Sequence, residues 1–137
     1  MTSYLLDCNH FSTALRKVSV VRDRIHQERR SGNRFVSCIP VICELEAGIL
    51  QTAEPAANHR RLGQLLRHVR LWPLDSATAR LYGTVFNELQ KKGKALSQVD
   101  MMLAALARQH KLTILTTDRD FEALQDLKTQ NWTTTRT

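Results

Sequence analysis

The amino-acid sequence predicts an α/β domain with a mostly parallel central sheet. Short apolar segments alternate with helical segments along the chain, which is the pattern of strand–helix–strand units. The helical segments carry apolar side chains at intervals of three and four residues. The chain has 137 residues, 42% of them hydrophobic, enough for one folded core. We therefore expect residues 1–137 to form a single domain.

The first half of the chain contains two predicted strands and four predicted helices. The apolar run Tyr4-Leu5-Leu6 ends in Asp7, and Ser31-Gly32-Asn33 has the composition of a turn. Pro40 suits the first turn of a helix, because its missing N–H needs no partner there. The predicted strands are 4–7 and 34–39, and the predicted helices are 10–15, 20–30, 40–51 and 57–69.

The second half continues the alternation. Ser97 is placed to cap a helix, and Gly93 to end the one before it. The predicted strands are 71–74, 112–115 and 127–132, the predicted helices are 75–89 and 97–110, and 116–121 is expected to be a loop. Functional sites of parallel sheets lie at the carboxyl ends of the strands. Asp7 ends the first strand and Asp118 follows the fourth, so these two acids are expected to converge.

The chain is strongly basic, with a net charge of +7 and a pI near 9.8. Many of its basic residues, histidines included, occur in three clusters, at 22–34, 59–70 and 91–94. This charge favours a polyanionic partner, although a soluble basic surface or an acidic protein partner would also account for it. Aromatic residues are few and not interleaved with the arginines, so a platform for stacking bases is not indicated.

Cysteine usage and hydropathy point to the cytoplasm. Cys8, Cys38 and Cys43 are odd in number and form no C-x-x-C pair, which argues against a disulfide framework or a zinc site. No apolar run is long enough to span a membrane. The N-terminus lacks a basic segment followed by an apolar one, so we expect no signal peptide.

The acidic residues favour metal chemistry. A phosphodiesterase without a covalent nucleophile needs a divalent ion to lower the pKa of bound water and neutralise phosphate charge. Mg²⁺ takes oxygen ligands, so carboxylates suit it. Two like charges ~4 Å apart repel by about 4 kcal/mol at an effective dielectric of ~20, so acids gathered in one cleft imply a cation.

Each acid also has a structural interpretation. Asp7 can simply end a strand, and Asp100 can stabilise a helix start as the last residue of Ser97-Gln98-Val99-Asp100. Asp118 and Asp120 can serve as turn or cap residues. Glu44 and Glu46 share one helix, and we favour Glu44 for the cleft because Ala47 and Gly48 leave space beside it, with Glu46 at the rim.

Four motifs in order resemble those of PIN-domain ribonucleases, especially the VapC-type toxins of bacterial toxin–antitoxin pairs. Residues 4–9 (YLLDCN) are similar to the family's opening strand and D-T-N, and residues 43–48 (CELEAG) to its E-L-x-x-G helix. Residues 100–105 (DMMLAA) resemble D-x-x-I-A-A, and 116–121 (TTDRDF) resemble T-x-D-x-D-F. Cys8 departs from the usual Thr, which removes a hydroxyl near the expected metal but spares the carboxylates.

The resemblance implies a three-layer α/β/α sandwich, an Mg²⁺ or Mn²⁺ ion, and endonucleolytic cleavage of RNA restrained by a cognate antitoxin. By the same resemblance, Asp7 and Asp100 ligate the metal most directly, while Glu44 and Asp118 ligate it or orient its waters. Asn9 and Thr116 support these ligands, and Asp120 is a further candidate. A homodimer is also implied. From the charge pattern, Arg60, Arg61, Lys91 and Lys92 are expected to contact RNA.

Two other functions fit parts of the sequence. A receiver-like domain that accepts a phosphoryl group calls for an adjacent acidic pair after the first strand, but Cys8 and Asn9 follow Asp7 here. A catalytically silent RNA- or partner-binding module of the same fold is the main alternative, and the presence of all four acids disfavours it.

Overall fold

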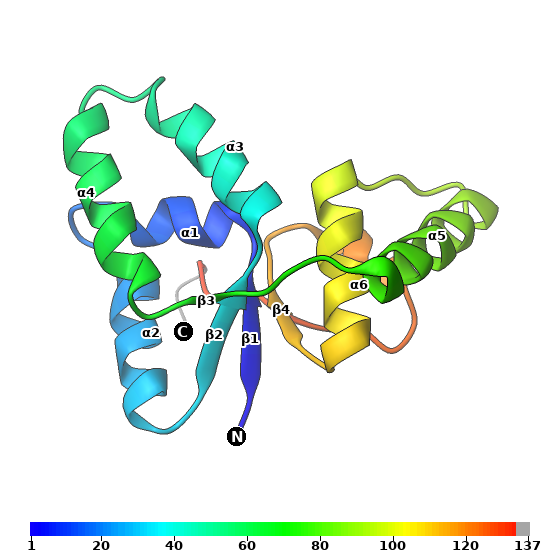
Figure 1. Ribbon diagram of the computed structural model, residues 1–137. Helices are drawn as coiled ribbons and strands as arrows, with labels where there is room; N and C mark the ends of the chain where they lie inside the picture. The colour runs from blue at the N-terminus through cyan, green and yellow to red at the C-terminus, as the bar shows by residue number, and fades with distance from the viewer. Residues whose placement is uncertain (134–137) are drawn as a thin grey trace.

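Five short strands form one sheet at the centre of the computed structural model, which describes residues 1–133 (Figure 1). The strand order is β3-β2-β1-β4-β5, and every neighbouring pair is parallel, as predicted. The strands are β1 (Ser3–Leu6), β2 (Arg34–Ser37), β3 (Arg70–Leu71), β4 (Thr113–Leu115) and β5 (Lys128–Gln130). The central strands are buried on both faces, as parallel sheets usually are.

Helices cover both sides of this sheet and give the predicted three layers. They are α1 (Cys8–Ala14), α2 (Val20–Arg30), α3 (Ile39–Ile49), α4 (Pro55–Leu66), α5 (Ser76–Lys91) and α6 (Gln98–His110). In Figure 1, α1, α2 and α4 lie to the left of the central strands, and α5 and α6 lie to the right. Helix α2 contacts β2, α6 contacts β4, and α5 packs along α6.

Polar side chains cap the first turns of four α-helices, and one of them is Ser19, whose hydroxyl accepts from the Arg22 N–H at α2. Asp7 caps α1, Ser97 caps α6, and Asp75 and Thr78 form a reciprocal capping box at α5. The cap explains why α1 begins at Cys8, two residues before the predicted start at His10. The Asp7 side chain satisfies a backbone N–H of the first turn, so the helix follows the strand directly.

Other element boundaries also differ from the sequence-based prediction. Strand β3 covers Arg70–Leu71 instead of 71–74, because Pro73 has no N–H to donate to a ladder. Strand β2 stops at Ser37, since Cys38 is already the N-cap of α3, whose first turn contains Pro40. The expected loop after β4 contains a short 3₁₀ helix, Arg119–Ala123, capped by Asp118.

The chain's last described segment returns to the core. Trp132 is buried, and its ring meets Tyr4 at 4.9 Å and Phe35 at 5.8 Å between ring centroids. The guanidinium of Arg24 lies 4.1 Å from the centroid of the Trp132 ring. These contacts hold residues 131–133 beside the first two strands. Among the described residues, no helix has the length and apolar character needed to cross a bilayer.

Candidate active site

Asp7 and Asp118 follow two neighbouring strands. The backbone N–H of Asp7 donates to the Leu115 carbonyl at 3.2 Å, which ties the end of β1 to the end of β4. Asp7 is only 4% exposed. Asp118 is half-buried; its N–H donates to the Thr116 hydroxyl at 3.0 Å, and its carboxylate accepts from the Asp120 N–H at 2.8 Å. The two acids therefore lie at the same edge of the sheet, as the topology predicts.

The Asp7 carboxylate is held by His10. Its Oδ1 atom accepts from the His10 backbone N–H at 2.8 Å and lies 3.1 Å from Nδ1 of the His10 ring. His10 is completely buried. Sequence reasoning did not single out this residue. The available signal was its position three residues after a helix-capping acid, one turn along the same face.

Asp100 joins the two strand-end acids from the first turn of α6. Burial raises the pKa of the Asp100 carboxyl most, and the negative charges of Asp7, Asp118 and Glu44 raise it further. A side-chain hydrogen bond with Ser97 lowers the pKa of Asp100 and opposes these effects. The structure therefore brings all four predicted acids into one electrostatic neighbourhood, although Glu44 and Asp100 lie on two different helices and Asp7 and Asp118 follow two strands.

Glu44 and Glu46 point to different neighbours. Glu44 lies on α3 beside Cys8, and both line a groove of about 330 Å³ between α1 and α3. Glu46 lies 3.2 Å from Nδ1 of His59 on α4. Helical periodicity alone did not distinguish Glu44 from Glu46. Their contacts do, and they place Glu44 on the side of the other acids.

Cys8 borders the acids without being activated by them. Burial raises the pKa of its thiol, and the charges of Glu44, Asp7 and Asp100 raise it further, while a hydrogen bond to Ser12 lowers it. A raised pKa keeps the thiol protonated at neutral pH, so Cys8 is a poor nucleophile.

The donor set suits a hydrated divalent ion. Within residues 1–133, no three carboxylate, imidazole or thiol groups converge as a ready-made ligand set. Such a compact set is what Zn²⁺ requires, whereas Mg²⁺ keeps several of its waters and binds through one or two carboxylates. The carboxylates of Asp7, Glu44 and Asp118 are close enough to Asp100 to raise its pKa, and oxygen donors of this kind suit a hydrated Mg²⁺ or Mn²⁺ ion.

The predicted supporting residues lie around the strand-end acids. The Asn9 amide donates to the Thr117 hydroxyl at 2.9 Å, which links α1 to the loop after β4. Thr116 is buried and accepts the Asp118 N–H. Asp120 is exposed and contributes its backbone N–H to the Asp118 carboxylate.

The predicted RNA-contacting residues fall on two separate helices. Arg60 and Arg61 lie on α4, and Lys91 and Lys92 lie at the end of α5, which is on the other side of the sheet in Figure 1. Arg61 also donates to the Asn58 side chain at 3.1 Å. The Lys92 ammonium donates to the carbonyl of Ala123, the last residue of the 3₁₀ helix that Asp118 caps.

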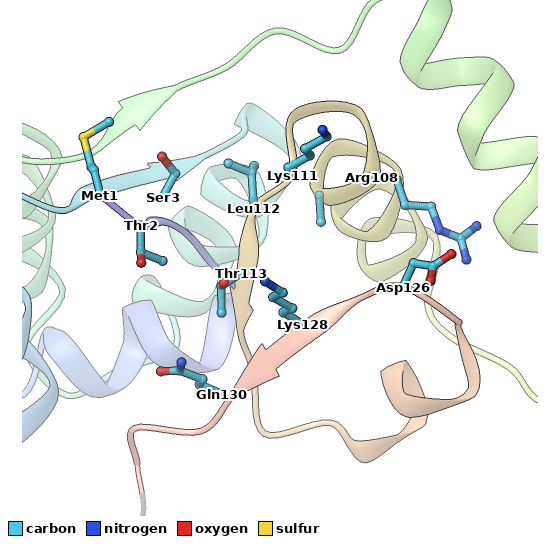
Figure 2. Close-up of a pocket in the computed structure, with 11 residues that line it drawn as sticks. Met1, Thr2, Ser3, Arg108, Lys111, Leu112, Thr113, Asp126, Lys128 and Gln130 are labelled. Carbon is cyan, nitrogen blue, oxygen red and sulfur yellow. The ribbon is translucent and has the colours of Figure 1, made fainter.

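A second pocket lies at the opposite edge of the sheet. It has a volume of about 760 Å³ and is lined by residues at the starts of β1, β4 and β5, including Ser3, Thr113 and Lys128 (Figure 2). The pocket is larger than the groove beside Glu44, but none of the four acids lines it. Its place at the amino ends of the strands separates it from the candidate active site.

Comparisons with known proteins identify relatives over nearly the whole chain. The sequence is 28% identical over 134 residues to Ribonuclease VapC2 of Haemophilus influenzae and equally to the tRNA(fMet)-specific endonuclease VapC of Shigella flexneri, covering 96% of this chain and 99% of each relative. The structure of VapBC2 from Rickettsia felis, bound to a DNA fragment from its promoter, matches with a TM-score of 0.85 at 21% identity, covering 96% of this chain and 99% of that one.

A second solved structure agrees in fold. VapBC-5 from Mycobacterium tuberculosis, a member of the VapBC family of toxin–antitoxin systems, matches with a TM-score of 0.67 at 21% identity, covering 96% of this chain and 98% of that one. The resemblance inferred from the four motifs is thereby confirmed. Residues 4–127 match the PIN domain, and the chain belongs to the PIN-domain family.

Proposed function

We propose that this protein is a divalent-metal-dependent endoribonuclease that acts as the toxin of a toxin–antitoxin pair. One observation carries the chemistry: the half-buried Asp100 carboxyl faces the charges of Asp7, Asp118 and Glu44. Such a group of acids is costly unless a cation neutralises it. The VapC relatives are named as a ribonuclease and a tRNA-specific endonuclease, which supports RNA as the substrate. The direct test is RNA cleavage by the purified protein with Mg²⁺ or Mn²⁺, compared with the same reaction in EDTA.

The four acids divide by position. Asp7, which is buried, and Asp100, which is half-buried in the first turn of α6, would hold the ion, and Glu44 and Asp118 would hold it or orient its waters. When bound, Mg²⁺ or Mn²⁺ would activate water and neutralise charge on the phosphate. Thr116 keeps the Asp118 backbone in place, and Asn9 fixes the start of α1 against the loop after β4. Asp120 would act through its backbone N–H on Asp118.

The basic helices supply the attraction for RNA. Arg61 lines a groove between α2 and α4 together with Arg22, His26 and His68. The pKa of His68 is lowered by burial and then by the positive charges of Arg29, His26 and Arg67, as expected beside a strongly positive surface. Phosphate contacts would come from Arg60 and Arg61 here, and from Lys91 and Lys92 on the other side of the sheet.

Neutralising these residues tests that assignment. The double variant Arg60→Gln/Arg61→Gln should weaken RNA binding, and so should the separate double variant Lys91→Gln/Lys92→Gln. With fewer phosphates contacted, binding releases fewer counterions from the RNA. The slope of log K against log[salt] should flatten by about 0.7 for each lost contact to a single strand. Fluorescence anisotropy at several salt concentrations measures this slope.

The matched control is Lys111→Gln/Lys128→Gln, in the pocket at the opposite edge of the sheet (Figure 2). It removes the same charge away from the acids and should leave the slope unchanged. If the control flattens the slope and the two test pairs do not, RNA lies on the other edge and the assignment is wrong.

An antitoxin would use the groove beside the acids. Most of the surface of that groove is apolar; Leu15, Leu45 and Ile49 contribute to it, and Glu44 also lines the groove. An apolar segment fits such a groove, and a basic side chain at its end would pair with the carboxylates that otherwise hold the metal. Self-association as a homodimer and a cytoplasmic location, where the three free cysteines would stay reduced, complete the proposal.

Co-expression tests the toxin role. Production of the protein should arrest bacterial growth, and the antitoxin, which we expect a short adjacent gene to encode, should co-purify with it and restore growth. Ile49→Lys, which places a charge in the buried wall of the groove, should weaken this capture more than Leu50→Lys, an exposed neighbour. If the adjacent product neither binds nor restores growth, a housekeeping RNA-processing nuclease becomes the preferred function.

A further inference from the structure

A buried imidazole connects the Asp7 carboxylate to the end of the described chain. The backbone N–H of Trp132 donates to Nε2 of His10 at 3.0 Å, across 122 positions in the sequence. Because Nε2 accepts this bond, it carries no proton, and the ring proton of the neutral imidazole must lie on Nδ1. Nδ1 therefore donates to Oδ1 of Asp7 at 3.1 Å. The protein environment thus selects one tautomer of His10.

This arrangement fixes the orientation of the Asp7 carboxylate. Within residues 1–133, both hydrogen bonds to that carboxylate come from His10 and end on Oδ1. Oδ2 is then the oxygen that remains available to a cation. The backbone bond alone would define the position of Oδ1, and the second bond from the ring restricts rotation of the carboxylate plane. Carboxylates that ligate metals are commonly oriented by such outer hydrogen bonds.

The far side of the imidazole rests on a rigid support. Trp132 is 4% exposed and packs against Tyr4 and Phe35 of the two central strands. Its backbone N–H is therefore held in place by the core, and the ring of His10 cannot turn without losing that bond. Asp7 is in this way linked to the docking of residues 131–133.

We infer that His10 is a positioning residue for Asp7, which sets the carboxylate for metal binding and couples that geometry to the docked C-terminal segment. The inference rests on the proposed metal site. It differs from a packing role, which the complete burial of His10 also provides, because it assigns separate duties to the two ring nitrogens. Nδ1 acts on the metal ligand, and Nε2 acts on the stability of the docked segment.

Two variants, each with a side-chain amide in place of the imidazole, test the roles of Nδ1 and Nε2 separately. In His10→Asn the amide can replace Nδ1 but is too short to reach Trp132. In His10→Gln the longer side chain places its carbonyl near the position of Nε2 and can accept from the Trp132 N–H. Mn²⁺ affinity, measured by electron paramagnetic resonance without RNA, reports on Asp7. The melting temperature of the metal-free protein reports on the contact with Trp132.

We expect His10→Asn to bind Mn²⁺ within about threefold of the wild type while melting lower. His10→Gln should melt closer to the wild type and bind Mn²⁺ at least ~10-fold more weakly, the lower end of the cost of losing such an outer partner. Equal affinities in all three proteins, or an equal loss in both variants, would overturn the inference and leave His10 a packing residue.

The tautomer provides a check that needs no metal. In the ¹⁵N NMR spectrum of the wild-type protein, Nδ1 of His10 should show the shift of a protonated nitrogen and Nε2 that of an unprotonated one. A proton on Nε2 would overturn the inference. Failure of the wild type itself to bind Mn²⁺ would instead contradict the metal site, and with it any role of His10 toward that site.

Discussion

Asp7→Asn and Asp100→Asn are each expected to lower the rate of RNA cleavage by at least about 100-fold. Both changes remove one negative charge from the set of acids that would hold the ion. The polarisation and water activation that a metal ion supplies amount to several kcal/mol, and ~3 kcal/mol is roughly a factor of 100 in rate. Cleavage of a defined RNA in Mg²⁺ or Mn²⁺, with an EDTA-treated reaction as the blank, measures the effect.

The fold should survive both substitutions. Asparagine is as good a helix N-cap as aspartate, so the side chain in Asp7→Asn would keep an oxygen that accepts from His10, and α1 would still begin at Cys8. Asp100 is a half-buried acid whose pKa is raised by burial and by three neighbouring acids, so neutralising it removes an unfavourable charge. The far-ultraviolet circular dichroism of both variants should match that of the wild type.

Glu122→Gln is the matched control, because it removes one carboxylate charge from an exposed position whose partner is Arg119 at 4.0 Å. It should cleave at close to the wild-type rate. Should Asp7→Asn and Asp100→Asn cleave as fast as this control, when purified in the same way, the four acids are not the catalytic site. Asp120→Asn, measured alongside, decides whether that exposed acid acts only through its backbone.

Most of the fold was predictable because its determinants are local. The apolar run at residues 4–6, the cap at Ser97 and the periodic helices are each readable within a few residues. The convergence of Asp7 and Asp118 was also predictable, since adjacent parallel strands present their carboxyl ends at one edge. The PIN-like family assignment required four motifs in order, and residues 4–127 match that family.

The remaining features depend on contacts between distant segments. Nothing near His10 in the sequence indicates that its ring accepts a bond from Trp132, 122 positions away. Glu44 and Glu46 could be separated only weakly by their neighbours, and the contact of Glu46 with His59 on another helix resolves them. Local propensity does not report such tertiary constraints.

Binding of the ion should raise the stability of the folded protein. The unfolded chain separates the four acids, so a cation that binds them together stabilises only the native state. At ~100 times the dissociation constant the gain is about 2.7 kcal/mol. For a chain of this length that corresponds to a rise of roughly 9 °C in the melting temperature. Differential scanning fluorimetry across an Mn²⁺ titration measures this rise.

Without metal, the negative charge of the Asp100 carboxylate should lower the stability of the folded protein. The pKa of Asp100 is raised above its ordinary value of 3.8 in the folded state, chiefly by burial and then by the neighbouring acids. Between the unfolded and folded pKa values the native state binds more protons, so its stability falls as the pH rises. Above the folded pKa this penalty is complete, and below about pH 3.8 it is absent.

Asp100→Asn should therefore melt at or above the wild type at pH 7 without metal, and the difference should narrow as the pH is lowered toward 4. Asp7→Asn is expected to gain less, because two hydrogen bonds from His10 already stabilise the Asp7 carboxylate. With saturating Mn²⁺ the order should reverse, since both variants lose a ligand charge. A melting temperature that rises no more with Mn²⁺ than with sodium chloride of equal ionic strength would argue against a metal site formed by these acids, because screening alone would then explain the shift.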